Sequence, residues 1–231
     1  QAVADDEDNT LRIYDRSRGG PPVWSLDISR FLGVDPRQPE VDIEAGTRAG
    51  DRIYWISSHG RNRKGKPRTS RHRFFATDIL PGPGHPVLQP VGLPRTQLLL
   101  EMLQDPRFAA LGLARASLLP PKAPGALSIE GLTTLPDGRL LLGFRNPQPA
   151  GRALLVPLDN PGEILAAKPA RFGDPILLDL GNRGVRGLGT SRSQVWIAAG
   201  AHDNAPRSQL FAWTPMSPEA IPIPGPDLAD L

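Results

Sequence analysis

The chain has 231 residues, 39% of them hydrophobic and 22% charged, which is enough length and apolar content for a folded core and excludes wholesale disorder. It has no cysteine, which excludes disulfides, thiolate zinc sites and cysteine nucleophiles, and no apolar run approaches the length of about 18 residues that a membrane-spanning helix needs. The formal net charge is +3, but residues 61–73 hold seven Lys or Arg and no acid, and without these seven, 20 basic residues face 24 acidic ones.

The amino end contains three short apolar runs separated by turn residues. We expect strands at Ala2–Ala4, Thr10–Tyr14 and Val23–Ile28, because β-branched and aromatic residues favour extended structure. Twenty-seven prolines and 24 glycines without a collagen-like period agree with many short elements joined by turns. By comparison with the units that follow, these are the second, third and fourth strands of a partial unit over residues 1–30, whose innermost strand is missing.

A unit of four apolar runs then occurs three times along the chain. The first and second runs of the three units are Val41–Gly46 with Arg52–Gly60, Leu127–Leu132 with Arg139–Asn146, and Gly184–Leu188 with Gln194–Ala201. A constant step of 15 residues links an early position of the first run to a late position of the second: Glu44 to His59, Glu130 to Arg145, and Arg186 to Ala201. This constancy indicates that the three units share one structure.

Each unit continues with a third and a fourth apolar run. The third runs are Phe74–Thr77, Ala153–Val156 and Leu210–Trp213, and the fourth are approximately Pro86–Val91, Pro175–Leu180 and Ala220–Ile223. Turn residues separate neighbouring runs, as antiparallel strands require. Four antiparallel strands in a repeated unit are typical of a β-propeller blade, so residues 40–92, 127–180 and 184–224 are predicted to be blades.

Residues 93–126 interrupt this order. From about residue 96 to residue 117 the apolar side chains recur with helical instead of alternating spacing, as at Leu98, Leu99 and Met102. Asp105 followed by Pro106 has the pattern of a helix N-cap with proline at the first helical position. We therefore predict an all-β fold, a single β-propeller domain over residues 1–231, with a short helical insertion near residues 96–117.

Several motifs are spread over nearly the whole chain: Ala4–Asn9, Asp42–Glu44, Ser58–Arg61, Ile129–Leu132, Phe144–Pro147 and Arg183–Arg186. Together they resemble the pattern of a bacterial family defined as a domain of unknown function. The resemblance implies a β-propeller distantly similar to esterase-like phytases, and it implies export, so we expect a periplasmic or secreted protein. It also implies that the domain is incomplete at both ends of the chain, with one strand before the first motif and another after Leu231.

Charged residues occupy equivalent positions of the repeated units. Glu44, Glu130 and Arg186 lie near the start of three inner strands, and Asp6, His59 and Arg145 lie near the end of second strands. Antiparallel pairing places the start of one strand and the end of its partner at the same edge of a sheet. We therefore expect these six side chains at one mouth of the propeller channel, provided that the register of the strands is as predicted.

This cluster has two interpretations. In the first, Glu44, Glu130 and His59 are catalytic, while Arg145, Arg186, Arg61 and Asn146 bind substrate. Asp6, Glu44 and Glu130 are then candidate ligands of a hard cation such as Ca²⁺, since clustered carboxylates repel one another unless they are bridged or paired. In the second, the same acids and arginines form structural ion pairs that join the blades.

The corresponding functions belong to different classes. The first is a metal-assisted hydrolase that acts on phosphate esters or related esters at the channel mouth, and the second is a non-catalytic propeller that binds a protein, a glycan or a small anion. We do not expect nucleic acid as a partner, because the basic stretch 61–73 has no interleaved aromatic residues and resembles a solvated loop. We expect a monomer.

Overall fold

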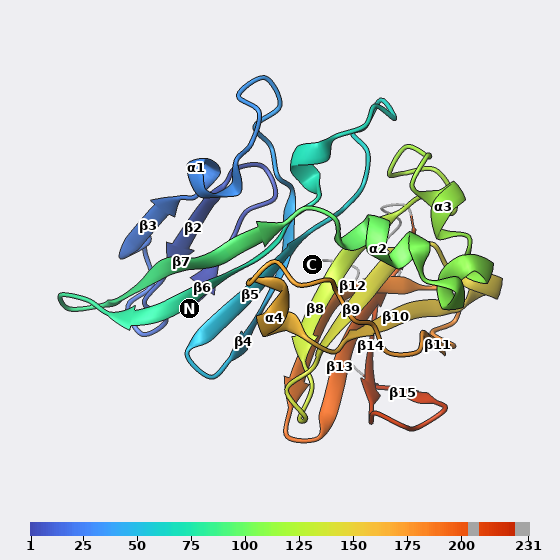
Figure 1. The fold of residues 1–231 in the computed structure, drawn as a ribbon. Coiled ribbons are helices and arrows are strands. Elements are labelled where there is room, and N and C mark those ends of the chain that lie inside the picture. The colour runs from blue at the N-terminus through green and yellow to red at the C-terminus, as the bar shows by residue number, and fades with distance from the viewer. Residues whose placement is uncertain (203–207, 225–231) are drawn as a thin grey trace.

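The computed structural model describes residues 1–202 and 208–224, and its four antiparallel sheets are the blades of a β-propeller (Figure 1). The first sheet has three strands, β1 (Ala2–Val3), β2 (Thr10–Ile13) and β3 (Trp24–Asp27). Among the described residues no strand pairs with the inner side of β1, so the first sheet is one strand short of the other three.

The other three sheets are four-stranded meanders in chain order. The second contains β4 (Ile43–Ala49), β5 (Arg52–Ser57), β6 (Phe74–Pro81) and β7 (Pro86–Arg95). The third contains β8 (Ser128–Thr134), β9 (Leu140–Asn146), β10 (Ala153–Leu158) and β11 (Ile176–Leu178). The fourth contains β12 (Gly184–Ser191), β13 (Gln194–Gly200), β14 (Gln209–Trp213) and β15 (Ala220–Pro222), and the β13–β14 connection at 203–207 lies outside the described residues.

The helical insertion is confirmed. It consists of α2 (Leu98–Gln104), a 3-10 helix at Pro106–Leu111 and α3 (Leu113–Ala116), and the Asp105 side chain accepts from the backbone N–H of Arg107 as the predicted cap. Four short elements were not predicted: α1 (Ser29–Leu32), α4 (Pro161–Ile164) and 3-10 turns at Thr69–Arg71 and Pro149–Gly151. Among the described residues, no helix is long and apolar enough to cross a membrane.

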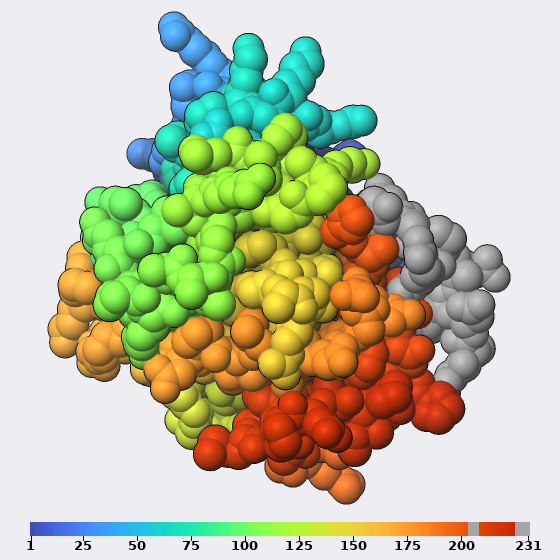
Figure 2. Space-filling model, turned by 90° about the vertical axis from the view of Figure 1, so that its right-hand side faces the viewer, coloured from blue at the N-terminus to red at the C-terminus, as the bar shows by residue number. Residues whose placement is uncertain are grey.

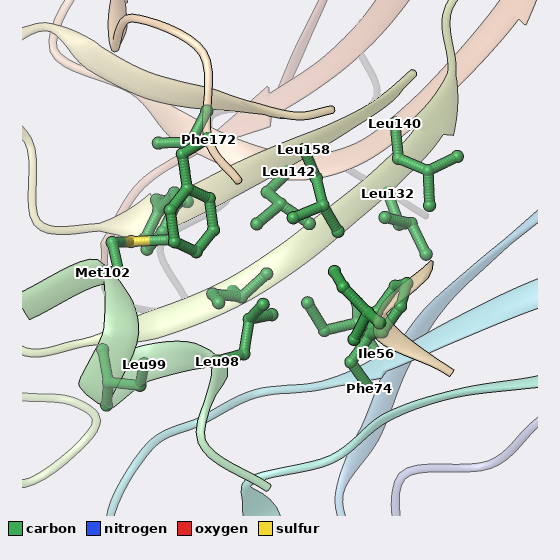
Figure 3. Packing of buried hydrophobic residues seen from close by; sticks show 14 of the residues in the cluster. Ile56, Phe74, Leu98, Leu99, Met102, Leu132, Leu140, Leu142, Leu158 and Phe172 are labelled. Carbon is green, nitrogen blue, oxygen red and sulfur yellow. The ribbon is translucent and has the colours of Figure 1, made fainter. Parts of the chain in front are cut away.

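The largest hydrophobic cluster lies between the second and third sheets and is closed by the insertion. Leu98 and Met102 of α2 are fully buried beside Leu142 and Phe172, and Figure 3 shows these side chains converging with Phe74 from the second sheet. Full burial of each such side chain contributes about 1.5–3 kcal/mol. The insertion is therefore part of the core and not an appendage of it.

The inner strands β4, β8 and β12 lie side by side. Hydroxyl groups link them, with Thr47 Oγ1 3.1 Å from Thr134 Oγ1 and Thr133 Oγ1 2.9 Å from Thr190 Oγ1. Two further clusters of buried apolar residues join the first sheet to the second and the third to the fourth. This arrangement brings the starts of the three inner strands together.

The expectation that residues 61–73 form a solvated loop is wrong for two of their arginines. Arg71 and Arg73 are buried, and Arg73 donates hydrogen bonds to the carbonyl oxygens of Leu32 and Thr69. The bond to Leu32 satisfies the last carbonyl of α1, which has no partner within that helix. The exposed residues of this connection are Arg63, Lys64, Lys66, Pro67 and Thr69.

Candidate functional site

A β-bulge lies at the equivalent position of each inner strand. In β4 the register steps from Ile43 to Ala45 while its partner β5 advances by one residue, so that Glu44 is the extra residue. The same step occurs at Glu130 in β8 and at Arg186 in β12. A bulge redirects the side chain of the extra residue. The three charged side chains therefore do not follow the regular alternation between the two faces of their strands.

Glu130 binds two arginines from neighbouring strands. Its Oε1 lies 3.0 Å from Nη1 of Arg145 on β9, and its Oε2 lies 2.9 Å from Nη1 of Arg186 on β12. Arg145 is itself skipped by the β8–β9 register, so a second bulge directs it towards Glu130. The hydroxyl of Ser128 donates to Glu130 Oε1 at 3.3 Å. We call Arg145, Glu130 and Arg186 the triad.

The triad is buried unevenly. Glu130 is 7% exposed, whereas 38% of the Arg186 side chain is exposed. A charge-assisted pair in such a shielded place is stronger than a surface ion pair, but its net contribution depends on the cost of removing the charges from water. Arg186 therefore has one face on Glu130 and another open to a ligand.

A glycine sets the distance between the third and fourth sheets at this point. A Cβ placed on Gly184, the first residue of β12, would lie 1.9 Å from the carbonyl oxygen of Arg145. Only glycine permits so close an approach of two backbones. The contact brings β12 against β9 and thereby places Arg186 next to Glu130.

Glu44 lies in an environment that favours its protonated form. Burial, followed by the negative charges of Glu130, Asp42 and Asp6, raises the pKa of Glu44 to about 8, while the charge of Arg186 opposes the shift. Glu44 is therefore largely a neutral carboxylic acid at pH 7. It also lines a pocket of about 520 Å³ between β1 and β4, on the side of β1 that carries no strand among the described residues.

A second group of ion pairs, which the sequence did not predict, lies near Glu44. Asp42 Oδ2 is 2.9 Å from Nη1 of Arg71, and Arg71 Nη2 is 2.5 Å from Oε1 of Glu40. Burial raises the pKa of Asp42 above its ordinary value, against the pull of Ser58 and Arg71. No spacing rule marks Arg71 among the seven basic residues of its segment, so only the fold shows that it is the buried partner.

His59 has other partners than the carboxylates. Its ring stacks on His72 at a centroid distance of 5.5 Å, and its Nδ1 lies 2.8 Å from the carbonyl oxygen of Ser57. Burial, followed by the charge of His72, lowers the pKa of His59 to about 3, so the imidazole is neutral at physiological pH. Its electrostatic neighbours are His72 and Arg73, and not Glu44 or Glu130.

The remaining predicted site residues, which are Arg61, Asn146 and Asp6, have surroundings that differ from one another. Arg61 is fixed by carbonyl oxygens, its Nε donating to Ser117 at 2.8 Å and its Nη1 to Gly65 at 2.9 Å. Asn146, next to Arg145, is 2% exposed, and its Nδ2 has no partner in the described part of the chain. Asp6 is exposed in the turn after β1.

The carboxylates do not form a ready-made cation site. Within residues 1–202 and 208–224, no three His, Cys, Asp or Glu side chains are grouped as they would be around a metal ion. Both oxygens of Glu130 are engaged by arginines, and Glu44 is largely protonated at neutral pH. A calcium ion would have to displace an arginine and a proton, so these residues as arranged do not fit it.

The geometry thus unites Glu44, Glu130, Arg145 and Arg186 at one mouth of the propeller, with Asp6 near enough to act on Glu44 by its charge. It places His59 and Arg61 at a separate pocket, between the β5–β6 connection and the helical insertion. No protein-family model and no curated protein matches the chain, so its fold as a β-propeller rests on the structure itself.

Proposed function

We propose that the protein is a hydrolase of phosphate esters or related esters, whose substrate binds at the mouth formed by Glu44 and the triad. The observation that carries the proposal is the difference between two neighbouring carboxyl groups. Glu130 is held between two arginines, whereas Glu44 has a pKa of about 8 and keeps its proton at pH 7. A carboxyl group that keeps its proton at neutral pH beside arginines that can bind an anion is a common basis for general-acid chemistry.

The triad supplies the affinity for an anionic group. One negative charge on Glu130 faces two positive charges, on Arg145 and Arg186, and the neutral Glu44 adds none. Arg186, with its exposed face, can bind a phosphoryl or carboxyl oxygen. Asn146 follows Arg145 in the chain, and its buried amide Nδ2, which has no partner among the described residues, is a further candidate donor.

Glu44 acts as the general acid. A water molecule adds to the phosphorus or carbonyl carbon, the bond to the leaving oxygen breaks, and Glu44 gives its proton to that oxygen. The proton that the water loses returns through solvent to the Glu44 carboxylate, so an ester and water become an acid and an alcohol. The arginines stabilise the negative charge that develops on the oxygens of the group under attack.

The first test compares the chain with its Glu44→Gln variant on phenyl phosphate and p-nitrophenyl phosphate. Because the acid helps a poor leaving group most, the variant should lose about 10²-fold or more on phenyl phosphate and much less on the nitrophenyl ester. The parent rate should fall as the pH rises through about 8, where Glu44 loses its proton, and the variant should lack this limb.

Glu7→Gln is the matched control, since it removes an exposed carboxylate from the turn that holds Asp6. Equal losses on the two esters, or a pH limb that persists in Glu44→Gln, would remove Glu44 from the role of acid. Phosphate monoesters and carboxylic esters should both be assayed, since the mouth would accept either kind of oxyanion.

A second function is favoured by one specific observation. Both oxygens of Glu130 are saturated by arginines, as in a structural joint between blades. In that case the mouth binds a small anion, a glycan or a protein without turning it over. Saturable binding of inorganic phosphate with no hydrolysis of any ester would support this function over the first. A monomeric, exported protein is part of either proposal.

Calcium is tested separately by thermal unfolding in EDTA and then with added Ca²⁺. An ion held at 100 times its dissociation constant stabilises a fold by about 2.7 kcal/mol. Because arginines occupy the oxygens of Glu130, we expect no such shift. A calcium-dependent increase in melting temperature that disappears in Glu44→Gln would instead place a cation at the mouth, as the sequence alone predicted.

A further inference from the structure

A second pocket lies away from the channel mouth. It has a volume of about 350 Å³ and lies between the β5–β6 connection and the helical insertion. Figure 2 shows these two segments meeting at the top of the molecule, the connection in cyan and the insertion in green. Neither Glu44 nor any member of the triad lines it. The proposed hydrolase chemistry makes no use of this pocket.

One wall of the pocket is apolar and partly open to solvent. It consists of Leu99, Leu100 and Leu103 of α2 together with Leu118, which follows α3. Leu100 is 52% exposed and Leu118 is 64% exposed. Exposed leucines that gather around a concave surface are a feature of ligand sites more than of ordinary surface.

A second wall, formed by the β5–β6 connection, carries two positive charges. Arg61 is fixed by the carbonyl oxygens of Ser117 and Gly65, and Arg68 donates to the amide oxygen of Gln38 at 3.1 Å. All of these acceptors are neutral. In the part of the chain that the structure describes, neither arginine is paired with a carboxylate, and no acidic residue lines the pocket. The two cations are held in place without compensation of their charge.

The remaining side of the pocket contains the stacked imidazoles of His59 and His72. His59 is 1% exposed, and its Nδ1 must carry the hydrogen because it faces the carbonyl oxygen of Ser57, which can only accept. Its Nε2 is then an acceptor, and it has no partner among the described residues. An acceptor does not attract an anion, so a negative head group in this pocket belongs beside the arginines.

We propose that this pocket binds an amphipathic carboxylate, with its head group beside Arg61 and Arg68 and its hydrocarbon body against the leucines. The charge of the one wall and the apolar surface of the other together select this class. A purely apolar ligand would leave the arginines unused, and a small inorganic anion would leave the leucines exposed.

The test measures binding of octanoate by calorimetry to the full chain, with 1-octanol, octylammonium and acetate as comparisons. Octanoate should bind saturably and at least about tenfold more tightly than any of the other three, because only octanoate combines a negative charge with the hydrocarbon tail. Leu118→Glu should weaken octanoate binding by about tenfold or more. Leu93→Glu, at a leucine that is 61% exposed outside the pocket, should leave it unchanged.

A second matched pair tests the cationic wall. Arg68→Gln should weaken octanoate binding about tenfold, whereas Arg63→Gln, in the same connection but outside the pocket, should not. The proposal is wrong if octanoate does not bind, if octanol binds as tightly as octanoate, or if a control variant weakens binding as much as its partner. Circular dichroism of each variant confirms that it is folded, and all four positions are at least partly exposed.

Discussion

Glu130→Gln is expected to lower the free energy of unfolding by about 3 kcal/mol, because it leaves two arginines facing a neutral amide in a shielded place. The range for breaking a buried pair is about 3–5 kcal/mol, and the partial exposure of Arg186 favours its lower end. For a chain of this length the loss corresponds to a decrease of roughly 6–12 °C in melting temperature. Urea unfolding, followed by tryptophan fluorescence, measures it directly.

The control removes the whole triad. In the variant Arg145→Met/Glu130→Leu/Arg186→Met no charge is left without its partner in the triad, and apolar side chains of similar size fill the space. Replacement of a complete buried ion-pair group by apolar residues is often neutral or stabilising. The triple variant should therefore recover at least half of the stability that Glu130→Gln loses, but it should not bind phosphate.

These two variants separate a structural role from a functional one. If the triple variant is stable and still binds phosphate, the triad is only a joint between blades. A Glu130→Gln variant as stable as the parent would show that the pairs contribute nothing, and it would remove the basis for a preorganised anion site.

The blade pattern was accessible from the sequence because short apolar runs, separated by turn residues, recur in units of four. The step of 15 residues from Glu130 to Arg145 placed both at the same edge of a sheet, and they form an ion pair. The amino-terminal strands and the Asp105 cap follow from local rules and were predicted for that reason. Features that repeat along the chain, or that depend on residues close in sequence, could therefore be predicted from the sequence.

The bulges were not predicted, although the sequence contains a signal for them. In each inner strand a charged residue follows a branched apolar residue and precedes Ala or Gly, as in Ile129–Gly131. In a strand with strict alternation, the register alone decides towards which face of the sheet a charged side chain points. The extra residue of a bulge changes the direction of that side chain. Three small residues at equivalent places after three charges were the available evidence.

The position of His59 and the burial of Arg71 could not be derived. Both depend on how the β5–β6 connection folds back on α1 and on the helical insertion, which are contacts between segments distant in sequence. A run of basic residues has the same composition whether its arginines are exposed or bind buried carbonyls. The sequence therefore indicated that this segment is basic, but not which of its arginines are buried.

Gly184→Ala should destabilise the fold by at least about 3 kcal/mol, because a Cβ 1.9 Å from the Arg145 carbonyl oxygen can be accommodated only by a shift of one backbone. Side-chain rearrangement cannot relieve the clash, since its nearest atoms are the O, C and Cα of Arg145. The shift separates β12 from β9, so Arg186 moves away from Glu130. Loss of phosphate binding should accompany loss of stability.

Gly189→Ala is the matched control, on the same strand, with no atom within 4 Å of the added Cβ. Its stability should equal that of the parent or exceed it slightly, because alanine restricts the unfolded chain more than glycine does. If the two alanine variants are equally stable, the close contact between β9 and β12 does not hold the sheets at this distance. Arg186 would then owe its position to its ion pair alone, and Glu130→Gln, which breaks that pair, should displace Arg186 as far as Gly184→Ala was expected to.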